Sequence, residues 1–355
     1  MRIAVFGYAH PFGEGTLYGA ERIIYYLIQE LKRRGHECVV FSVEGCNLPG
    51  FDFVKMHVPW ENEKDIYLDA VIKKEAEDGK KFDMIHSCMA SGFIDKKLRD
   101  DWFYCLNPFF GFSNFRENIV AYSHRLNHAN NNTSTVIHYG IPEELYSDEI
   151  VDHDGYLVWI GRMDMGKAPD IAIDVAKRLG KRIILMGHSY HYPYFVDKIY
   201  DQIDNDKVIW LRGVTDELKK RIFKKAEAFL STNWCQYGEM FGIVNIEALA
   251  CGCPVIGWGN SDEPYSSEIN FRGGKIIENG KQGFLVEYNN YSDGQREASI
   301  EKAVQSVKNI GQISRLDCRK LFEEKFTTKI MTNKIEKYYG IIKERKTVLN
   351  VTGEL

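Results

Sequence analysis

The hydrophobic and polar positions at the start of the chain follow the pattern of a strand, a helix and a second strand. Residues 3–6 and 38–43 are short apolar runs rich in β-forming side chains, and a glycine-containing loop covers residues 7–19. Between the runs, apolar side chains recur at the spacing of one helix face, at Ala20, Ile23, Ile24, Leu27, Ile28 and Leu31. Two strands joined by a crossover helix predict a right-handed parallel unit.

This pattern continues and then restarts after a polar, acidic segment at residues 143–154, which we interpret as a linker. Before the linker, further strands are expected at residues 84–86, 102–106, 119–122 and 136–138. After it, strands are expected at residues 156–160, 182–186, 208–211, 230–232 and 254–257. Helices are expected over residues 169–179, 218–229, 243–250 and the charged stretch from Thr327, with residues 348–355 as a frayed tail.

Two βα repeats of similar size predict an α/β fold of two doubly wound domains, over residues 1–150 and 151–327. Ligands of such domains bind at the carboxyl ends of the strands, in a cleft that two facing domains would share. The candidate functional residues are therefore those that directly follow strands.

Composition narrows the class of protein. The chain has 355 residues, of which 44% are hydrophobic and 27% charged, as is usual for folded globular proteins. Its formal net charge of -4 argues against a nucleic-acid partner. No apolar run approaches the roughly 20 residues that cross a bilayer, and the first residues do not resemble a secretory signal. The eight scattered cysteines favour neither a zinc site nor a disulfide scaffold, so we expect a cytoplasmic protein without a metal.

Two cations follow the strand predicted at residues 156–160. Arg162 and Lys167 are five residues apart, and a planar guanidinium and a mobile ammonium in one loop can converge on one diphosphate. Taken alone, the two cations are more typical of a solvated basic loop.

Two carboxylates bracket the start of the helix predicted at residues 243–250. Glu239 and Glu247 are eight residues apart, a helical rise of about 12 Å, which is similar to the distance from a donor sugar ring to the ribose of a nucleotide sugar. Backbone N–H groups at Gly242 and Ile243 would meet the diphosphate, and Gly242 has no side chain to obstruct it. Since its neighbours make the helix largely buried, the carboxylate of Glu247 needs a specific partner.

These segments resemble a known family. EMFGIVNIEALACGCPVI at residues 239–256 is similar to the E-x7-E signature of family 4 retaining glycosyltransferases, which have the GT-B fold of two Rossmann-like domains facing a central cleft. LVWIGRMDMGK at residues 157–167 resembles the G-R-x4-K phosphate loop of that family. Other segments agree in the same order: GAER, LKRRGHECVV, FDMIHSC, VIHYGIPEELY and GKQGFLV.

The resemblance implies a donor site in the second domain for a UDP- or GDP-linked sugar, with no cofactor or metal. Glu239 would contact the donor sugar hydroxyls, Glu247 would bind the ribose, and Arg162 and Lys167 would neutralise the leaving nucleoside diphosphate. A helix over residues 328–345 would pack back on the first domain. The remaining donor-site residues implied by the resemblance are Gly19, which lets the first domain approach the phosphates, and Met240, Phe241, Gly242 and Ile243.

The acceptor side departs from the family pattern. Tyr18 stands where many relatives have glycine, Cys88 replaces the second histidine of an H-x-H pattern, and Asn107 stands where a histidine often follows the strand. Tyr18, His86 and Asn107 are therefore the acceptor-side candidates, although His86 equally fits a histidine satisfied within the fold. The aromatic-rich residues 102–115 fit either an acceptor wall or a packed strand and loop.

The resemblance thus implies a retaining hexosyltransferase of glycan biosynthesis, which moves a sugar to a hydroxyl of a glycan, a glycolipid such as a lipid-linked glycan, or a small molecule. It would act in the cytoplasm or peripherally at the inner face of the membrane. One alternative is a GT-B-like protein that binds nucleotide sugars without turnover. The other is an NAD-dependent oxidoreductase, whose glycine fingerprint here lacks its third glycine at Tyr18. The donor sugar, acceptor, linkage and oligomeric state are not defined by the sequence.

Overall fold

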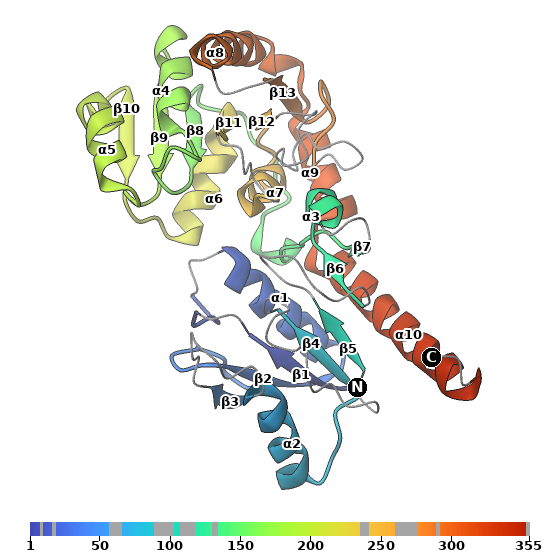
Figure 1. Ribbon diagram of the computed structural model, residues 1–355. Coiled ribbons are helices and arrows are strands. Elements are labelled where there is room, and N and C mark those ends of the chain that lie inside the picture. Colours follow the sequence, from blue (N-terminus) through green and yellow to red (C-terminus); the bar gives the residue numbers. More distant parts are fainter. Residues whose placement is uncertain are drawn as a thin grey trace. The chain divides into compact units, whose positions relative to one another are not determined.

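The computed structural model describes residues 1–7, 10–15, 19–56, 66–88, 103–106, 118–129, 134–234, 241–259, 276–288 and 292–352. Contacts between residues divide the chain into two compact units (Figure 1). The first unit comprises Met1–Tyr122, Leu126–Pro142 and Thr327–Leu355, and the second comprises Ser123–Arg125 and Glu143–Phe326.

The first unit is built on a parallel sheet with the strand order β3-β2-β1-β4-β5. These strands are β1 (Arg2–Phe6), β2 (Glu37–Val43), β3 (Asp52–Met56), β4 (Met84–Ser87) and β5 (Tyr104–Leu106). A short parallel pair, β6 (Val120–Ala121) and β7 (Thr135–Val136), lies outside this sheet. The helices of this unit are α1 (Gly19–Arg33), α2 (Ile66–Asp78), most of α3 (His124–Ala129), and α10 (Thr328–Thr352).

In the core of the first unit, both faces of the central strands are buried. All of β1 is buried, as expected for a central strand of a parallel sheet. The predicted apolar stripe of α1, from Ile23 to Leu31, is buried. Helix α10 packs against α1, and Arg34 beyond the end of α1 binds Glu336 on α10. The last helix therefore completes the first unit although it comes after the second in sequence.

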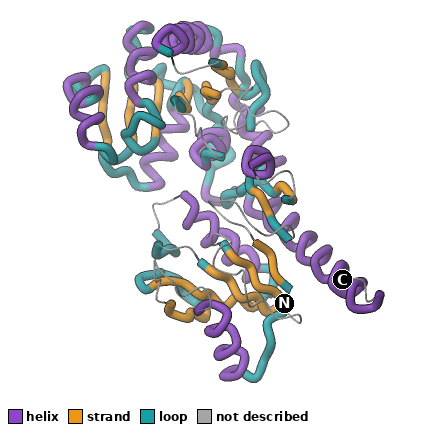
Figure 2. The backbone as a smooth tube through the Cα atoms, in the orientation of Figure 1, coloured by secondary structure: helices purple, strands orange, loops and turns teal. Residues whose placement is uncertain are grey.

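The second unit is built on a larger parallel sheet, whose strands are drawn in orange in Figure 2. Their order is β10-β9-β8-β11-β12-β13. Its strands are β8 (Leu157–Ile160), β9 (Ile183–Met186), β10 (Val208–Leu211), β11 (Ala228–Ser231), β12 (Val255–Gly259) and β13 (Gly283–Glu287). Its α-helices are α4 (Pro169–Arg178), α5 (Tyr192–Lys198), α6 (Asp216–Lys225), α7 (Ile243–Ala250), α8 (Asp293–Lys308) and α9 (Arg315–Lys325). The short 3-10 helices are η2 (Glu143–Leu145), η3 (Tyr200–Gln202) and η5 (Ile310–Gln312).

The strand order of this unit reverses direction between β8 and β11. From β8 the chain proceeds outward through β9 to β10, and from β11 it proceeds the other way through β12 to β13. Right-handed crossovers therefore place α4 and α7 on opposite faces of the sheet. In agreement, α4 packs against α8, and α7 packs against α6 and α9 (Figure 1). Both units are thus doubly wound, and the predicted α/β fold class is confirmed.

Several predicted boundaries differ from the structure. Phe229 was expected to end a helix but lies in β11, because α6 ends at Lys225 and the buried apolar run that follows is a strand. The predicted linker is not free of structure, since the Tyr146 ring packs against Phe322 within the second unit. Residues 143–150 therefore belong with that unit rather than with the first. The predicted frayed tail is helical as far as Thr352.

Candidate functional site

The candidate site lies at the carboxyl edge of the second sheet, where the strand order reverses. The loop that carries Arg162 and Lys167 follows β8, and α7 follows β11. These two strands are hydrogen-bonded neighbours, with Leu157 opposite Ala228 and Val158 opposite Phe229. A switch point of this kind opens a crevice between the loops of neighbouring strands, and in open α/β sheets this is where ligands bind.

Arg162 stands in the first turn beyond β8. Its guanidinium Nε lies 3.1 Å from Oδ2 of Asp164, and its side chain is 61% exposed. The guanidinium carbon also lies 4.9 Å from the centre of the Tyr190 ring, in cation–π geometry. Asp164 and Tyr190 thus hold an exposed fork of donors at this edge of the sheet.

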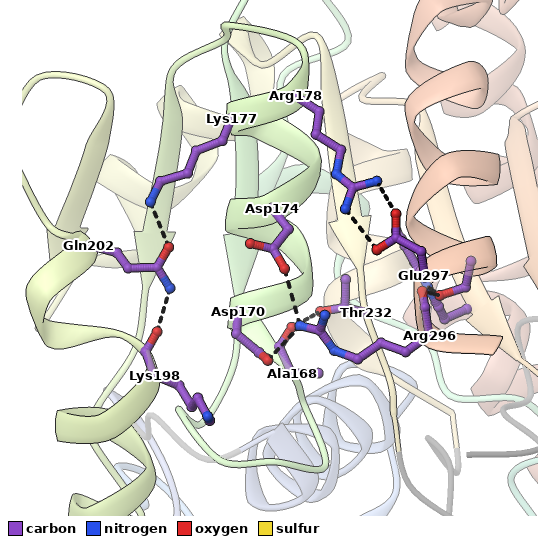
Figure 3. Close-up of polar contacts among 12 residues, drawn as sticks. Ala168, Asp170, Asp174, Lys177, Arg178, Lys198, Gln202, Thr232, Arg296 and Glu297 are labelled. Atoms are coloured by element: carbon purple, nitrogen blue, oxygen red, sulfur yellow. Dashed lines mark hydrogen bonds and ion pairs between the residues drawn. The ribbon is translucent and has the colours of Figure 1, made fainter. Parts of the chain in front are cut away.

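The backbone at Lys167 is fixed by hydrogen bonds from two directions. Its N–H donates to Oδ1 of Asp164 at 2.9 Å, and its carbonyl oxygen accepts from the hydroxyl of Thr232 at 2.7 Å. The same hydroxyl lies 3.0 Å from the carbonyl oxygen of Ala168 and accepts from the indole N–H of Trp159 at 2.8 Å. Figure 3 shows Thr232 beside Ala168 at the start of α4. Because Thr232 directly follows β11, these bonds join the two sides of the switch point.

The start of α4 is further anchored by ion pairs to α8. Asp170 and Asp174 both bind the guanidinium of Arg296, at 2.8 and 3.2 Å (Figure 3). At the other end of α4, Arg178 binds Glu297 on α8 in a two-pronged pair. These contacts hold the helix that begins directly after the cationic loop.

Two loops approach each other closely at the carboxyl ends of β8 and β9. Gly187 has a φ of +145°, and a Cβ there would lie 1.9 Å from the carbonyl oxygen of Gly161. A backbone bond from the N–H of Met163 to the carbonyl oxygen of His188, at 3.0 Å, continues this contact. Only glycine fits at Gly187, so the path of the cationic loop depends on it.

Helix α7 begins as the sequence predicts. Gly242 adopts a left-handed conformation, with φ 75°, and no side chain among the described residues caps the helix, so its first N–H groups can bond another acceptor. Ile243 is the first helical residue, and Phe241 is buried, with its ring 6.1 Å from that of Phe326. The left-handed turn and the uncapped N-terminus suit an anion.

Glu247 has the specific partner that its burial requires. Its side chain is 1% exposed, and its Oε1 accepts from Nζ of Lys219 at 2.7 Å and from the hydroxyl of Tyr146 at 3.3 Å. Lys219 is itself only 7% exposed at the side chain. The structure therefore presents Glu247 as one half of a buried ion pair.

The structure does not test the placement of the remaining predicted residues at this site. Glu239, Met240, Tyr18 and Asn107 lie outside the described residues. Gly19 is the first residue of α1 in the first unit.

His86 lies in the core of the first unit. It is fully buried in β4, where its Nδ1 lies 2.7 Å from the hydroxyl of Tyr339. Burial lowers the pKa of His86 to about 4, so the ring is neutral at pH 7. The Tyr339 contact accounts for Nδ1 only, since Nε2 is buried without a hydrogen-bond partner among the described residues, and an acceptor-side role stays a prediction.

Two residues that position the site were not found from the sequence. Thr232 is an ordinary strand-end residue by pattern, and only the fold brings its hydroxyl to the Lys167 loop. Lys219 lies within the basic stretch DELKKRIFKK, which is typical of a solvated helix face. The signal that could have found it is the need of buried Glu247 for a cation.

Neither a metal cluster nor a bilayer-crossing helix is found in the part of the chain that the structure describes. No three His, Cys, Asp or Glu side chains there are grouped to hold an ion. None of the helices there combines the length and apolar character that crossing a membrane requires.

Residues 142–309, which include the whole candidate site, match the family described as glycosyl transferases group 1. Two curated relatives are D-inositol 3-phosphate glycosyltransferases. The protein from Mycobacteroides abscessus is 32% identical over 106 residues, and that from Mycolicibacterium smegmatis is 29% identical over 106 residues. Each match covers 28% of this chain and 23% or 24% of the relative, so the chain spans only about a quarter of their length.

Solved structures share the fold over nearly the whole chain. A glycosyltransferase from Rickettsia africae is 16% identical with a TM-score of 0.73, and one involved in avilamycin A biosynthesis is 17% identical with a TM-score of 0.68. Both alignments cover 96% of this chain and 98% of the other. HepE from Anabaena, in complex with UDP and glucose, is 14% identical with a TM-score of 0.63, over 95% of this chain and 98% of HepE. The fold is therefore GT-B, with two Rossmann-like domains; the cleft between them stays a prediction.

Proposed function

We propose that this protein is a family 4 retaining glycosyltransferase, which transfers a hexosyl group from a UDP- or GDP-linked sugar to a hydroxyl acceptor. The observation that carries the proposal is the meeting of two anion-binding elements at the switch point of the second sheet. The cationic loop follows β8 and the uncapped start of α7 follows β11, and Thr232 bonds the two sides together. The match of this region to the glycosyl transferases group 1 family supports the same conclusion.

The proposed roles follow from the charges that develop in the reaction. When the bond between the anomeric carbon and the phosphate oxygen breaks, negative charge grows on the diphosphate. Arg162, Lys167 and the N–H groups at the start of α7 offset that charge, and preorganised donors of this kind stabilise a transition state by several kcal/mol. The acceptor oxygen bonds to the anomeric carbon on the face that the leaving group vacates, and its proton passes to a diphosphate oxygen. Configuration is thereby retained.

The other residues of the donor site bind the two ends of the nucleotide sugar. Glu239 contacts the sugar hydroxyls, Glu247 the ribose hydroxyls, and Met240, Phe241, Gly242 and Ile243 line the space between. We assign no cofactor and no metal, because Arg162, Lys167 and the helix N-terminus already supply positive charge to the diphosphate.

The acceptor side belongs to the first unit in this proposal. Gly19 permits close approach to the phosphates, and Tyr18, His86 and Asn107 are the acceptor-side candidates. A glycan or glycolipid of cytoplasmic biosynthesis, including a lipid-linked glycan at the inner face of the membrane, is the proposed acceptor class. A transferase for a small-molecule acceptor uses the same donor site.

Two other functions share parts of this geometry. An oxidoreductase of the Rossmann type needs a tight glycine turn after the first strand, whereas residues 7–18 separate β1 from α1 here. A protein that binds nucleotide sugars without turnover has the same donor site. Turnover distinguishes it from the transferase.

The proposal is tested by measuring release of UDP or GDP from a panel of nucleotide sugars, with and without hydroxyl acceptors. We expect release from at least one donor and its loss in Glu239→Gln, while the thermal unfolding of that variant stays like the wild type. If a nucleotide sugar binds but no UDP or GDP is released in the presence of any acceptor, the result would favour a binding protein without turnover. Affinity for NAD with none for nucleotide sugars would favour the oxidoreductase.

A further inference from the structure

We infer that Lys219 and Tyr146 are positioning residues for donor recognition, which hold the Glu247 carboxylate ionised and in one orientation toward the ribose hydroxyls. This inference rests on the proposed function. The family resemblance does not imply this role. A buried cation on α6, Lys219, contacts the carboxylate of Glu247 on α7.

The two contacts converge on one oxygen of Glu247. Nζ of Lys219 lies 2.7 Å and the hydroxyl of Tyr146 lies 3.3 Å from Oε1. Both are donors, so both favour the ionised carboxylate over the protonated acid. With Oε1 held from two sides, the carboxylate cannot rotate without breaking both bonds.

The ion pair lies inside the second unit rather than on its surface. The side chains of Lys219 and Glu247 are 7% and 1% exposed. Asp216, one turn earlier on α6, lies 3.0 Å from Nζ and is 54% exposed, so it binds Lys219 from the solvent side. A pair this deeply buried is a poor general stabiliser, because desolvation offsets most of the attraction. A need for orientation explains it better than a need for stability.

Residues of α9 hold the segment that carries Tyr146. The guanidinium of Arg319 on α9 donates to the carbonyl oxygens of Tyr146 and of Ala250, at 3.2 and 2.9 Å. One buried arginine thus joins the segment that carries Tyr146 to the C-terminal end of α7. The Tyr146 ring also packs against Phe322, with 6.0 Å between centroids. The hydroxyl that contacts Glu247 is therefore on a fixed support.

Helix α6 is fixed in a similar way at its start. The Thr215 hydroxyl caps the helix by accepting from the N–H of Leu218, the residue directly before Lys219. Lys219 thus extends from the first turn of a capped helix, where its ammonium is placed with little freedom.

The experiment compares UDP and GDP with their 2′,3′-dideoxy counterparts by isothermal titration calorimetry. For each base, the dissociation constant of the dideoxy nucleotide divided by that of the ribonucleotide reports how much the ribose hydroxyls contribute to binding. We expect the wild type to prefer the ribonucleotide by about tenfold or more, as for a hydrogen bond to a charged group. In Lys219→Met the ratio should fall toward one, and in Tyr146→Phe it should fall by a smaller factor. Lys219→Arg should recover part of it.

The matched control is Lys181→Met. Lys181 also forms an ion pair with a largely buried partner, Glu227, at 2.6 Å, but at the amino ends of β9 and β11, far along the strands from the site. We expect it to lower stability without changing the ratio. If Lys219→Met does not fold, Tyr146→Phe and Lys219→Arg still carry the comparison.

The outcomes separate the inference from the proposed function. An unchanged ratio in Tyr146→Phe and Lys219→Met, or equal weakening of both nucleotides, would show that the pair is only structural. A wild type that binds the ribonucleotide and its dideoxy form equally would overturn the inference and leave the donor site standing. A wild type that binds neither UDP nor GDP would overturn the proposed function itself.

Discussion

The hydroxyl of Thr232 lies 2.7 Å from the carbonyl oxygen of Lys167 and connects the end of β11 to the loop after β8. It also receives the indole N–H of Trp159 at 2.8 Å, which makes it the centre of a small buried network. The left-handed backbone of Ala168, with φ 44°, lies directly beside this network. A non-glycine residue in that conformation persists only where its surroundings hold it. Thr232 therefore sets the path of the loop that carries both cations.

We predict that Thr232→Val lowers both stability and nucleotide affinity. It removes the hydroxyl that bonds both the Trp159 N–H and the Lys167 carbonyl oxygen and leaves these two groups with their longer contact to each other, at 3.3 Å. The loss of these buried bonds destabilises the fold by about 1–3 kcal/mol. Urea denaturation measures the loss of stability, and titration with UDP or GDP measures the loss of affinity. Thr232→Ser keeps the hydroxyl and should behave almost like the wild type; a valine variant with unchanged affinity would show that the loop does not depend on this bond.

Removing either cation should weaken diphosphate binding without unfolding the protein. Arg162 is exposed, and the bonds of Lys167 to Asp164 and Thr232 are made by its N–H and carbonyl oxygen, so alanine at either position keeps those backbone bonds. A lost charge-assisted hydrogen bond weakens binding by about 1.5–3 kcal/mol, or roughly tenfold to a hundredfold. Titration of each variant with UDP or GDP measures this. Wild-type affinity in both variants would mean that the diphosphate binds elsewhere.

Gly187→Ala should disrupt the cationic loop more than an ordinary glycine substitution does. A Cβ there would lie 1.9 Å from the Gly161 carbonyl oxygen, so one loop must move. Gly180 also has a positive φ, of 64°, but has open space around it. Gly180→Ala should therefore show only the backbone penalty, about 1–2 kcal/mol. Thermal unfolding and nucleotide titration of both variants test this, and equal behaviour would contradict it.

Acid should destabilise the first unit through His86. Burial lowers the pKa of His86 from 6.5 to about 4. Between these two pH values the ring is protonated in the unfolded chain but stays neutral in the folded chain, so acid favours unfolding. Stability is fully retained above pH 6.5 and falls between pH 6.5 and pH 4, by about 3 kcal/mol in total.

The measurement is the free energy of unfolding by urea across that pH range. Carboxylates also titrate there, so the comparison is with His86→Gln, which has no ring to protonate. The difference between wild type and variant should change with pH in the stated direction. A difference that is constant with pH would show that His86 is not buried in its neutral form.

The sequence predicted most of the strands and the helices α1, α4, α6, α7 and α10, because local patterns and tertiary packing agree in those segments. The apolar stripe from Ile23 to Leu31 and the proline-opened helix at Pro169 are examples. Helices α3, α5, α8 and α9 were not predicted. Strands β3 and β13 were missed. Both lie at the edge of their sheets and are only partly buried, and the residues DFVKM of β3 lack a continuous apolar run. The end of α6 was misplaced because Phe229 is apolar in either a helix or a strand.

The sequence predicted the charged residues of the candidate site but not the residues that position them. Arg162 directly follows β8 and Gly161, and Lys167 lies in the same loop, at the edge of a parallel sheet where ligands bind. The burial of Glu247 and its need for a partner could also be inferred from its apolar neighbours. That Lys219 is the partner could not, because four basic residues of α6 besides it are equivalent by pattern, and only packing selects one.

The central claim is that the carboxyl edge of the second sheet binds a nucleoside diphosphate. A crystal structure of the protein with bound UDP or GDP tests it most directly. We predict the diphosphate between the cations of Arg162 and Lys167 and the N–H groups at Gly242 and Ile243, with the ribose hydroxyls at Glu247. A diphosphate bound away from these groups would contradict the account.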